Sequence, residues 1–191
     1  VVNEQNLPSA EFALFGGGGI KAQAIRWLYP RAARVTCIAE GIARELVEKY
    51  GTPSQLVQVV PNPIDLTRVR SLGQVAPDHP WYHLPQPVLV AVGRLHHQKG
   101  FDVLIRAFAQ VRRSRLCKLL ILGEGALQQE LQQLVQELGL VEDVQLPGFQ
   151  ENPYSYMAHA AAFVLSSRYE GFGNVLVEAL ALGTPVISTR C

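Results

Sequence analysis

Two glutamates, Glu170 and Glu178, flank a Gly-Phe-Gly turn in the segment SSRYEGFGNVLVEALALG at residues 166–183. Glu178 is the only charge in the apolar stretch after the turn, and a carboxylate in so apolar an element is costly unless it is hydrogen-bonded. An ionised carboxylate only accepts hydrogen bonds, so the two hydroxyls of a ribose are suitable partners. The alternative is that Glu170 caps the helix and Glu178 pairs with a surface cation.

The turn between the two glutamates favours an anion. Gly171 and Gly173 permit positive φ and a close approach of the backbone to a ligand. The N–H groups of residues 172–174 would then face an anion at the start of the following helix, where anions commonly bind. Glu170, across the turn, would reach hydroxyls beyond the phosphates. The pattern favours a nucleotide diphosphate sugar, with its ribose at Glu178 and its sugar at Glu170.

A pair of cations, Arg94 and Lys99, lies in the segment GRLHHQKG at residues 93–100. Arg94 ends an expected strand and Lys99 precedes an expected helix, whose N-terminus carries a partial positive charge. A hydrogen bond to a charged group contributes about 1.5–3 kcal/mol. The two cations would therefore hold a diphosphate without a metal; otherwise they are solvated loop residues.

The second half of the chain alternates apolar runs with amphipathic stretches. The runs predict strands buried on both faces, at residues 87–95, 117–125, 143–149, 162–167 and 185–190. The amphipathic stretches predict helices, at residues 101–113, 126–139, 152–161 (with Asn152 as N-cap) and 174–183. This order predicts an α/β fold with a parallel sheet covered on both faces. Ligands bind beyond the carboxyl ends of such strands, where the segments GRLHHQKG, GEG, LPGFQEN and SRYEGFG fall.

The first half is a second, shorter α/β region. It predicts helices at 20–32 and 41–51, strands at 34–40 and 55–61, and a flexible loop in the glycine run at 16–19. The proline-rich stretch at 63–86 shows little periodicity, so it is interpreted as a linker between residues 1–62 and residues 87–191. Both ends of the sequence are abrupt, which we interpret as a fragment of a longer protein.

Composition excludes several classes. With 17 basic and 16 acidic side chains the net charge is +1, which does not favour a nucleic-acid partner. Three cysteines without metal-ligand spacing predict reduced thiols and a cytoplasmic location. The segment GEGALQ lacks the third glycine of a dinucleotide fingerprint, which disfavours an oxidoreductase. The segment at 20–34, which contains the helix expected at 20–32, carries four cations and Trp27, so it suits either contact with a membrane surface or docking onto the sheet.

The segment EGFGNVLVE at 170–178 has the form E-x7-E with an internal Phe-Gly. It resembles the signature of retaining glycosyltransferases of the GT-B fold, most closely glycosyltransferase family 4. The further segments that resemble the family in order and spacing lie at 59–65, 93–108, 119–125, 144–152 and 161–173. The resemblance implies two Rossmann-like domains: the end of an acceptor-side domain at 1–62, and an incomplete nucleotide-sugar-binding domain at 87–191.

The resemblance also implies roles for individual residues. Arg94 and Lys99 would bind the donor diphosphate, and Glu178 the ribose. Glu170 would be the catalytic residue, orienting the donor sugar and stabilising charge rather than acting as a nucleophile. The other implied donor-binding residues are Phe149 and Gln150 at the nucleobase, and Phe172, Gly173 and Asn174 at the sugar and phosphates.

The implied reaction transfers a hexosyl group, with retention, from a nucleotide diphosphate sugar to a hydroxyl acceptor. The donor would be a UDP-sugar on family grounds, and the acceptor a glycan, a lipid-linked glycan or a small molecule. No cofactor or metal is expected, and the chain contains no Asp-x-Asp pair of the kind that metal-dependent transferases use. Two alternatives stay open: a non-catalytic module that binds nucleotide sugars, and a GT-B nucleotide-sugar epimerase.

Overall fold

The chain forms two compact units in the computed structural model, which describes residues 1–15 and 18–191. The first unit comprises Val1–Pro63 and Tyr169–Gly173, and the second comprises Ile64–Arg168 and Asn174–Cys191. Gly16 and Gly17, in the predicted loop at 16–19, lie outside the described residues, and a helix begins at Gly18.

The second unit is built on a parallel sheet of five strands in the order β6-β5-β4-β7-β8. The strands are β4 (Val88–Val92), β5 (Lys118–Leu122), β6 (Val144–Gly148), β7 (Ala162–Leu165) and β8 (Val186–Ser188). The chain proceeds outward from β4 first to β5 and β6, and then returns to the other side of β4 to form β7 and β8. This reversal at β4 is the point where ligands bind in open α/β sheets. The predicted α/β fold with a parallel sheet is confirmed.

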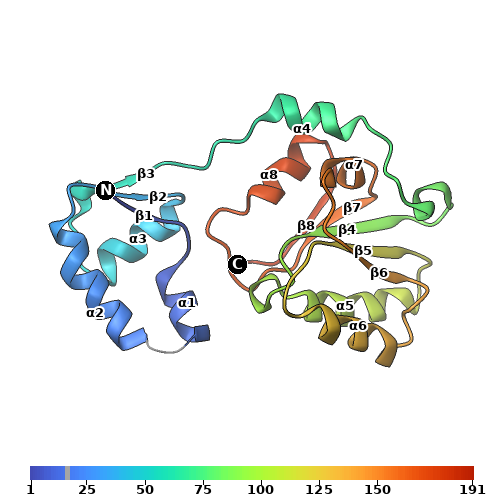
Figure 1. Cartoon of the computed structure of the whole chain (residues 1–191), viewed down its shortest axis with the longest axis horizontal. Helices are drawn as coiled ribbons and strands as arrows, with labels where there is room; N and C mark the ends of the chain where they lie inside the picture. The colour runs from blue at the N-terminus through green and yellow to red at the C-terminus, as the bar shows by residue number, and fades with distance from the viewer. Residues whose placement is uncertain (16–17) are drawn as a thin grey trace. The chain divides into compact units, whose positions relative to one another are not determined.

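Helices cover both faces of this sheet (Figure 1). They are α4 (Leu66–Gly73), α5 (Phe101–Arg112), α6 (Gln128–Glu137), α7 (Pro153–Ala158) and α8 (Asn174–Ala181). Successive side chains of a strand point to opposite faces, so Leu119 and Ile121 pack in the cluster with α5 and α6, whereas Leu120 and Leu122 pack in the cluster with α7 and α8. All four are buried, which explains the unbroken apolar run in the sequence.

The linker predicted at 63–86 is wrong, because residues 64–86 are part of the second unit. They form α4 and a 3-10 turn, η3 (Pro80–His83), whose Trp81 is buried in the sheet core. Gly73, at the end of α4, lies so close to Leu182 that a Cβ would clash. Asn152 is the N-cap residue of α7, as predicted, but its side chain donates to the carbonyl of Leu72 at 3.0 Å and makes no capping hydrogen bond.

The first unit contains a three-stranded parallel sheet in the order β1-β2-β3. Its elements are β1 (Val2–Glu4), α1 (Pro8–Phe15), α2 (Gly18–Leu28), the 3-10 turn η1 (Tyr29–Arg31), β2 (Val35–Cys37), α3 (Glu40–Glu48), the 3-10 turn η2 (Ser54–Leu56) and β3 (Val57–Val59). Sequence analysis missed β1 and α1, since a three-residue strand shows no periodicity. None of the helices in the described ranges is long and apolar enough to cross a bilayer.

Candidate functional site

The carboxyl ends of β4, β5 and β6 are joined by backbone hydrogen bonds that continue into their loops. The N–H of Leu95 donates to the carbonyl of Glu124, and the N–H of Gly123 to the carbonyl of Gly148, both at 2.9 Å. Gly123 has a φ of 135°, and a Cβ there would clash with the carbonyl of Gly93. Only glycine at position 123 lets the two loops approach so closely. The loops therefore form a fixed floor at this edge of the sheet.

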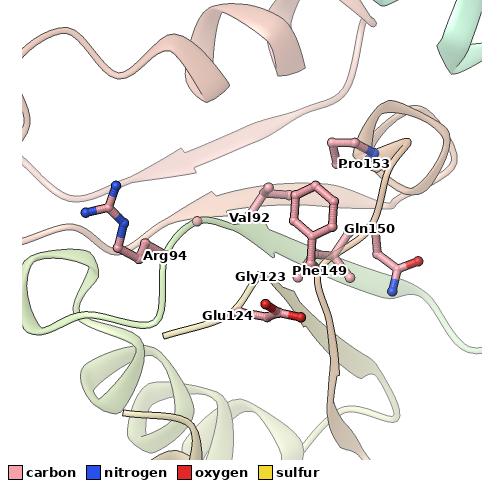
Figure 2. A pocket seen from close by; sticks show the side chains of 9 residues that line it. Val92, Arg94, Gly123, Glu124, Phe149, Gln150 and Pro153 are labelled. Atoms are coloured by element: carbon pink, nitrogen blue, oxygen red, sulfur yellow. The ribbon is translucent and has the colours of Figure 1, made fainter. Parts of the chain in front are cut away.

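A cavity of about 340 Å³ lies over this floor, within the range of about 300–1,000 Å³ that is typical of small-molecule sites. In Figure 2 Arg94 lies on one side of the cavity, and Phe149, Gln150 and Pro153 lie together on the other side. The lining residues are Val92, Gly93, Arg94, Leu122, Gly123, Glu124, Phe149, Gln150 and Pro153. Three of the four segments predicted to share this edge thus contribute to one cavity.

The two predicted cations, Arg94 and Lys99, both lie in the loop that follows β4. Arg94 is exposed, and none of the residues described in the structure forms an ion pair or hydrogen bond with its guanidinium. The aliphatic stem of Lys99 lies over Gly93, where a Cβ would come within 3.3 Å of the lysine Cδ and Cε. A side chain at position 93 would therefore crowd this lysine.

The exposed ring of Phe149 is the main apolar surface of the cavity. Its side chain is 66% exposed, which is unusual for a large apolar ring unless a partner covers it. The Gln150 amide is already engaged, because its Oε1 accepts a hydrogen bond from the Tyr156 hydroxyl at 3.0 Å. Phe149 thus offers a stacking surface, and Gln150 lines the cavity with an amide that is oriented by Tyr156.

Glu178 is half-buried on α8 and accepts a hydrogen bond from the Tyr154 hydroxyl at 3.1 Å. Burial raises the pKa of Glu178 and the hydrogen bond from Tyr154 opposes that rise. The predicted need for a hydrogen-bond partner is thus met by a tyrosine, and no cation among the described residues pairs with this carboxylate. No signal in the sequence identifies Tyr154 as this partner, because helical spacing does not show where a tyrosine hydroxyl ends.

The remaining predicted site residues lie in the Gly-Phe-Gly turn or directly beside it. Glu170, Phe172 and Gly173 belong to the first unit, where the Phe172 ring packs against the core cluster. A donor contact by residue 172 would therefore come from its backbone N–H. Gly173 has a φ of 74°, and the exposed Asn174 is the first residue of α8, as the predicted helix start requires. The structure thus divides the predicted site residues between the two units.

Sequence analysis missed one polar residue of the cavity, Glu124, which lies between the two glycines of the GEG segment. Its exposed carboxylate lines the cavity together with Phe149 (Figure 2). The segment was interpreted only through its glycines. Its position directly after a buried strand was the available signal.

Two protein families match the chain. The family "Glycosyl transferases group 1" matches residues 82–191, and "Glycosyltransferase Family 4" matches residues 12–68. Together with the fold and the position of the cavity, these matches define a glycosyltransferase of the GT-B class. The chain belongs to the group 1 glycosyl transferases, of the family 4 type, which confirms the resemblance in the sequence.

Several curated relatives are glycosyltransferases by name. The N-acetylgalactosamine-N,N'-diacetylbacillosaminyl-diphospho-undecaprenol 4-alpha-N-acetylgalactosaminyltransferase of Campylobacter jejuni is 36% identical over 192 residues, which cover 99% of this chain and 50% of the relative. The lipopolysaccharide core biosynthesis glycosyltransferase LpsE of Rhizobium meliloti is 34% identical, covering 82% of this chain and 44% of its own length. The chain thus spans about half the length of these relatives.

Solved structures share the fold. Anabaena Alr3699/HepE, in complex with UDP and glucose, superposes with a TM-score of 0.83 at 24% identity, covering all of this chain and 52% of that one. TarM of S. aureus superposes with a TM-score of 0.78 at 19% identity, covering 97% of this chain and 35% of that one. At these identities the likeness establishes the GT-B fold alone.

Proposed function

We propose that the protein is a retaining glycosyltransferase that moves a hexosyl group from a nucleotide diphosphate sugar to a hydroxyl acceptor. The observation that carries the proposal is the cavity beyond β4, β5 and β6, which is lined by the exposed ring of Phe149 and by Arg94, with the stem of Lys99 lying over the lining residue Gly93. An aromatic surface for a base beside two positive charges suits a nucleoside diphosphate. The solved Anabaena protein that shares the fold contains UDP and glucose, which supports a UDP-sugar donor.

Each part of the donor then has a partner of suitable chemistry. The base stacks on Phe149, and the diphosphate lies against Arg94 and Lys99, which neutralise the negative charge that grows on the leaving phosphate. The Glu178 carboxylate accepts from the ribose hydroxyls while Tyr154 holds it in place. The sugar and diphosphate also contact the turn formed by Phe172, Gly173 and Asn174.

Glu170 orients the donor sugar and stabilises charge in the transition state. The acceptor hydroxyl attacks from the face that the nucleotide leaves, so the configuration at the transferred carbon is retained. The departing phosphate helps to take the acceptor proton. The two cations supply the positive charge that a metal ion would otherwise bring, and no cofactor is used.

The acceptor in this proposal is a hydroxyl of a glycan, a lipid-linked glycan or a small molecule. The names of the Campylobacter and Rhizobium relatives point to lipid-linked and lipopolysaccharide glycans. The three cysteines are unpaired, two of them buried, which suits the reducing cytoplasm. The relatives are about twice as long as this chain. We therefore expect sugar transfer from the whole protein.

Calorimetric titration of the chain with UDP, UDP-glucose and GDP tests the donor site. We expect UDP and UDP-glucose to bind, and binding to weaken strongly in Lys99→Ala and in Glu178→Ala. Arg113→Ala and Glu130→Ala are the matched controls, because both residues are exposed, Arg113 as the C-cap of α5 and Glu130 on α6. A folded chain that binds no nucleotide, or that binds equally well in all four variants, would contradict the proposal. Product analysis with the full protein then distinguishes transfer from epimerisation.

A further inference from the structure

Arg168, the last residue of β7's loop within the second unit, forms a two-pronged ion pair with Asp102. Its Nη1 lies 2.8 Å from Oδ1 and its Nη2 lies 2.7 Å from Oδ2 of the carboxylate. Asp102 is in the first turn of α5, three residues after Lys99. The guanidinium holds the pKa of Asp102 below its ordinary value. Both side chains are about one-third exposed, and a partly exposed ion pair by itself stabilises a fold only slightly.

Arg168 and Ser166 also donate hydrogen bonds to the 3-10 turn η4 (His97–Lys99), which carries Lys99. Each of the three carbonyls of this turn accepts one of these bonds. The carbonyl of His97 accepts from Arg168 Nη1 at 2.7 Å, and the carbonyl of Gln98 accepts from the Arg168 backbone N–H at 2.7 Å. The carbonyl of Lys99 accepts from the Ser166 hydroxyl at 2.8 Å. Three successive carbonyls are thus held by residues 166–168.

The next residue, Gly100, shows how closely the turn and this segment approach. Gly100 has a φ of 62°, and a Cβ there would clash with the carbonyl of Ser166. On its other side the stem of Lys99 lies over Gly93 at the end of β4. The backbone of Lys99 therefore has little freedom, and the stem of its side chain lies against Gly93, which lines the cavity next to Arg94.

We propose that Arg168 is a positioning residue for the donor diphosphate, acting with Asp102 and Ser166 to fix the turn that carries Lys99. The proposal rests on the function proposed above. Preorganised charge interacts more strongly with an anion than charge on a mobile chain, because no ordering cost remains at the moment of binding. Arg168 itself touches no substrate in this role. Its loss should therefore weaken the phosphate part of the donor affinity and leave the nucleoside part intact.

The test compares UDP with uridine, since the two differ only in the diphosphate. Both are titrated into the wild-type chain, Arg168→Gln and Asp102→Asn, with UDP followed by calorimetry and uridine by NMR. We expect the UDP dissociation constant to rise about tenfold in Arg168→Gln, as for loss of one charge-assisted contact, while the uridine constant stays unchanged. Arg168→Lys keeps the charge without the planar fork and should recover part of the loss. Arg113→Gln is the control for removal of an exposed arginine.

A merely structural role for Arg168 would give a different result. UDP and uridine would then weaken by the same factor, or neither would weaken, and either outcome overturns the proposal. If Arg168→Gln does not fold, Asp102→Asn and Ser166→Ala each remove one contact and decide the question by the same ratio. Wild-type chain that fails to bind UDP overturns the proposed function and this inference with it. UDP binding that is lost in Lys99→Ala but kept in Arg168→Gln overturns only this inference.

Discussion

The two ends of the sheet in the second unit differ in whether their basic side chains form ion pairs. Where β5 begins, Asp143 is nearly buried and lies 2.7 Å from Arg112 Nε and 2.9 Å from Lys118 Nζ. Where β4 ends, Arg94 lines the cavity and its exposed guanidinium has no partner among the described residues. One end neutralises its cations within the fold, and the other leaves positive charge available to an anion.

The two cations beside Asp143 lower the pKa of its carboxyl group. Burial raises the pKa of the carboxyl, but Lys118 and Arg112 outweigh burial and bring the pKa below its ordinary value. The Arg112 Nε–H is not aligned for a hydrogen bond. We therefore attribute the effect of Arg112 on the pKa of Asp143 to its positive charge at short distance. Lys118 also donates to the carbonyl of Glu142 at 2.7 Å. This end of the sheet therefore contributes stability, while the cavity end is where we propose that the donor binds.

The largest expected effect is the loss of stability in Asp143→Ala. Removing the carboxylate leaves Arg112 and Lys118 without their common partner, which should lower the free energy of unfolding by about 2–3 kcal/mol. Urea unfolding measures the change, with Glu142→Ala as the neighbouring exposed control. UDP affinity per folded molecule should stay at the wild-type value. A clear loss of affinity in the folded variant would show that the two ends of the sheet are not separate in function.

Phe149→Ala should give the opposite result, a loss of binding without a loss of stability. Stacking of a base on an aromatic ring contributes about 1–3 kcal/mol, so we expect UDP affinity to fall about ten- to a hundredfold. The ring is already mostly exposed, so its removal costs the fold little and the unfolding midpoint should not move. Phe149→Tyr keeps the ring and should keep the affinity. Equal loss in the alanine and tyrosine variants would argue against stacking.

The sequence predicted the binding end of the sheet better than the packing around it. Arg94 and Phe149 follow closely after buried strands, and the ends of parallel strands meet at one edge, so order along the chain was enough to predict that they lie at one cavity. The glycines at 93 and 123 were likewise visible as breaks after apolar runs. These features depend on local pattern, which a single sequence displays.

Contacts between residues that are far apart in the sequence could not be predicted in this way. Helical spacing indicates that Tyr154 packs inward but says nothing about where its hydroxyl ends, so the hydrogen bond to Glu178 was missed. The stretch at 63–86 was interpreted as a linker because its prolines hide a short helix, and the burial of Trp81 depends on the sheet it covers. The pairing of Arg168 with Asp102 joins residues that are 66 positions apart, and no local pattern predicts it.

A smaller effect is expected for the pH dependence of donor binding. Glu178 must be ionised to accept ribose hydroxyls, and its pKa is raised, so affinity should fall with decreasing pH sooner than for an ordinary glutamate with a pKa of about 4.3. Because Tyr154 opposes the rise, Tyr154→Phe should raise the pKa further and shift the loss of affinity to higher pH. UDP titrations from neutral into acid pH measure the shift. Tyr82→Phe is the control, since the Tyr82 hydroxyl donates to the Tyr156 carbonyl instead.

The contribution of Glu178 to stability and its contribution to donor binding change in opposite directions as pH rises. Its pKa is higher in the folded chain than in the unfolded chain, so ionisation disfavours folding. The contribution is most favourable below the unfolded pKa and declines as pH rises towards the folded pKa. Binding, in contrast, improves over the same interval. A binding profile for Tyr154→Phe that coincides with the wild type would show that Glu178 does not contact the donor.

The smallest expected effect is that of a chelator. If Arg94 and Lys99 replace a metal at the diphosphate, EDTA should leave the UDP affinity unchanged, and added Mg²⁺ should not increase it. Raising the salt concentration should weaken binding, because an exposed guanidinium at the cavity is screened by ions. Lys99→Ala provides the sharper comparison: a variant whose UDP affinity is restored by Mg²⁺ would show that a metal can supply the missing charge. A wild-type chain that loses UDP on chelation would show that the site depends on a metal as well as on its own charges.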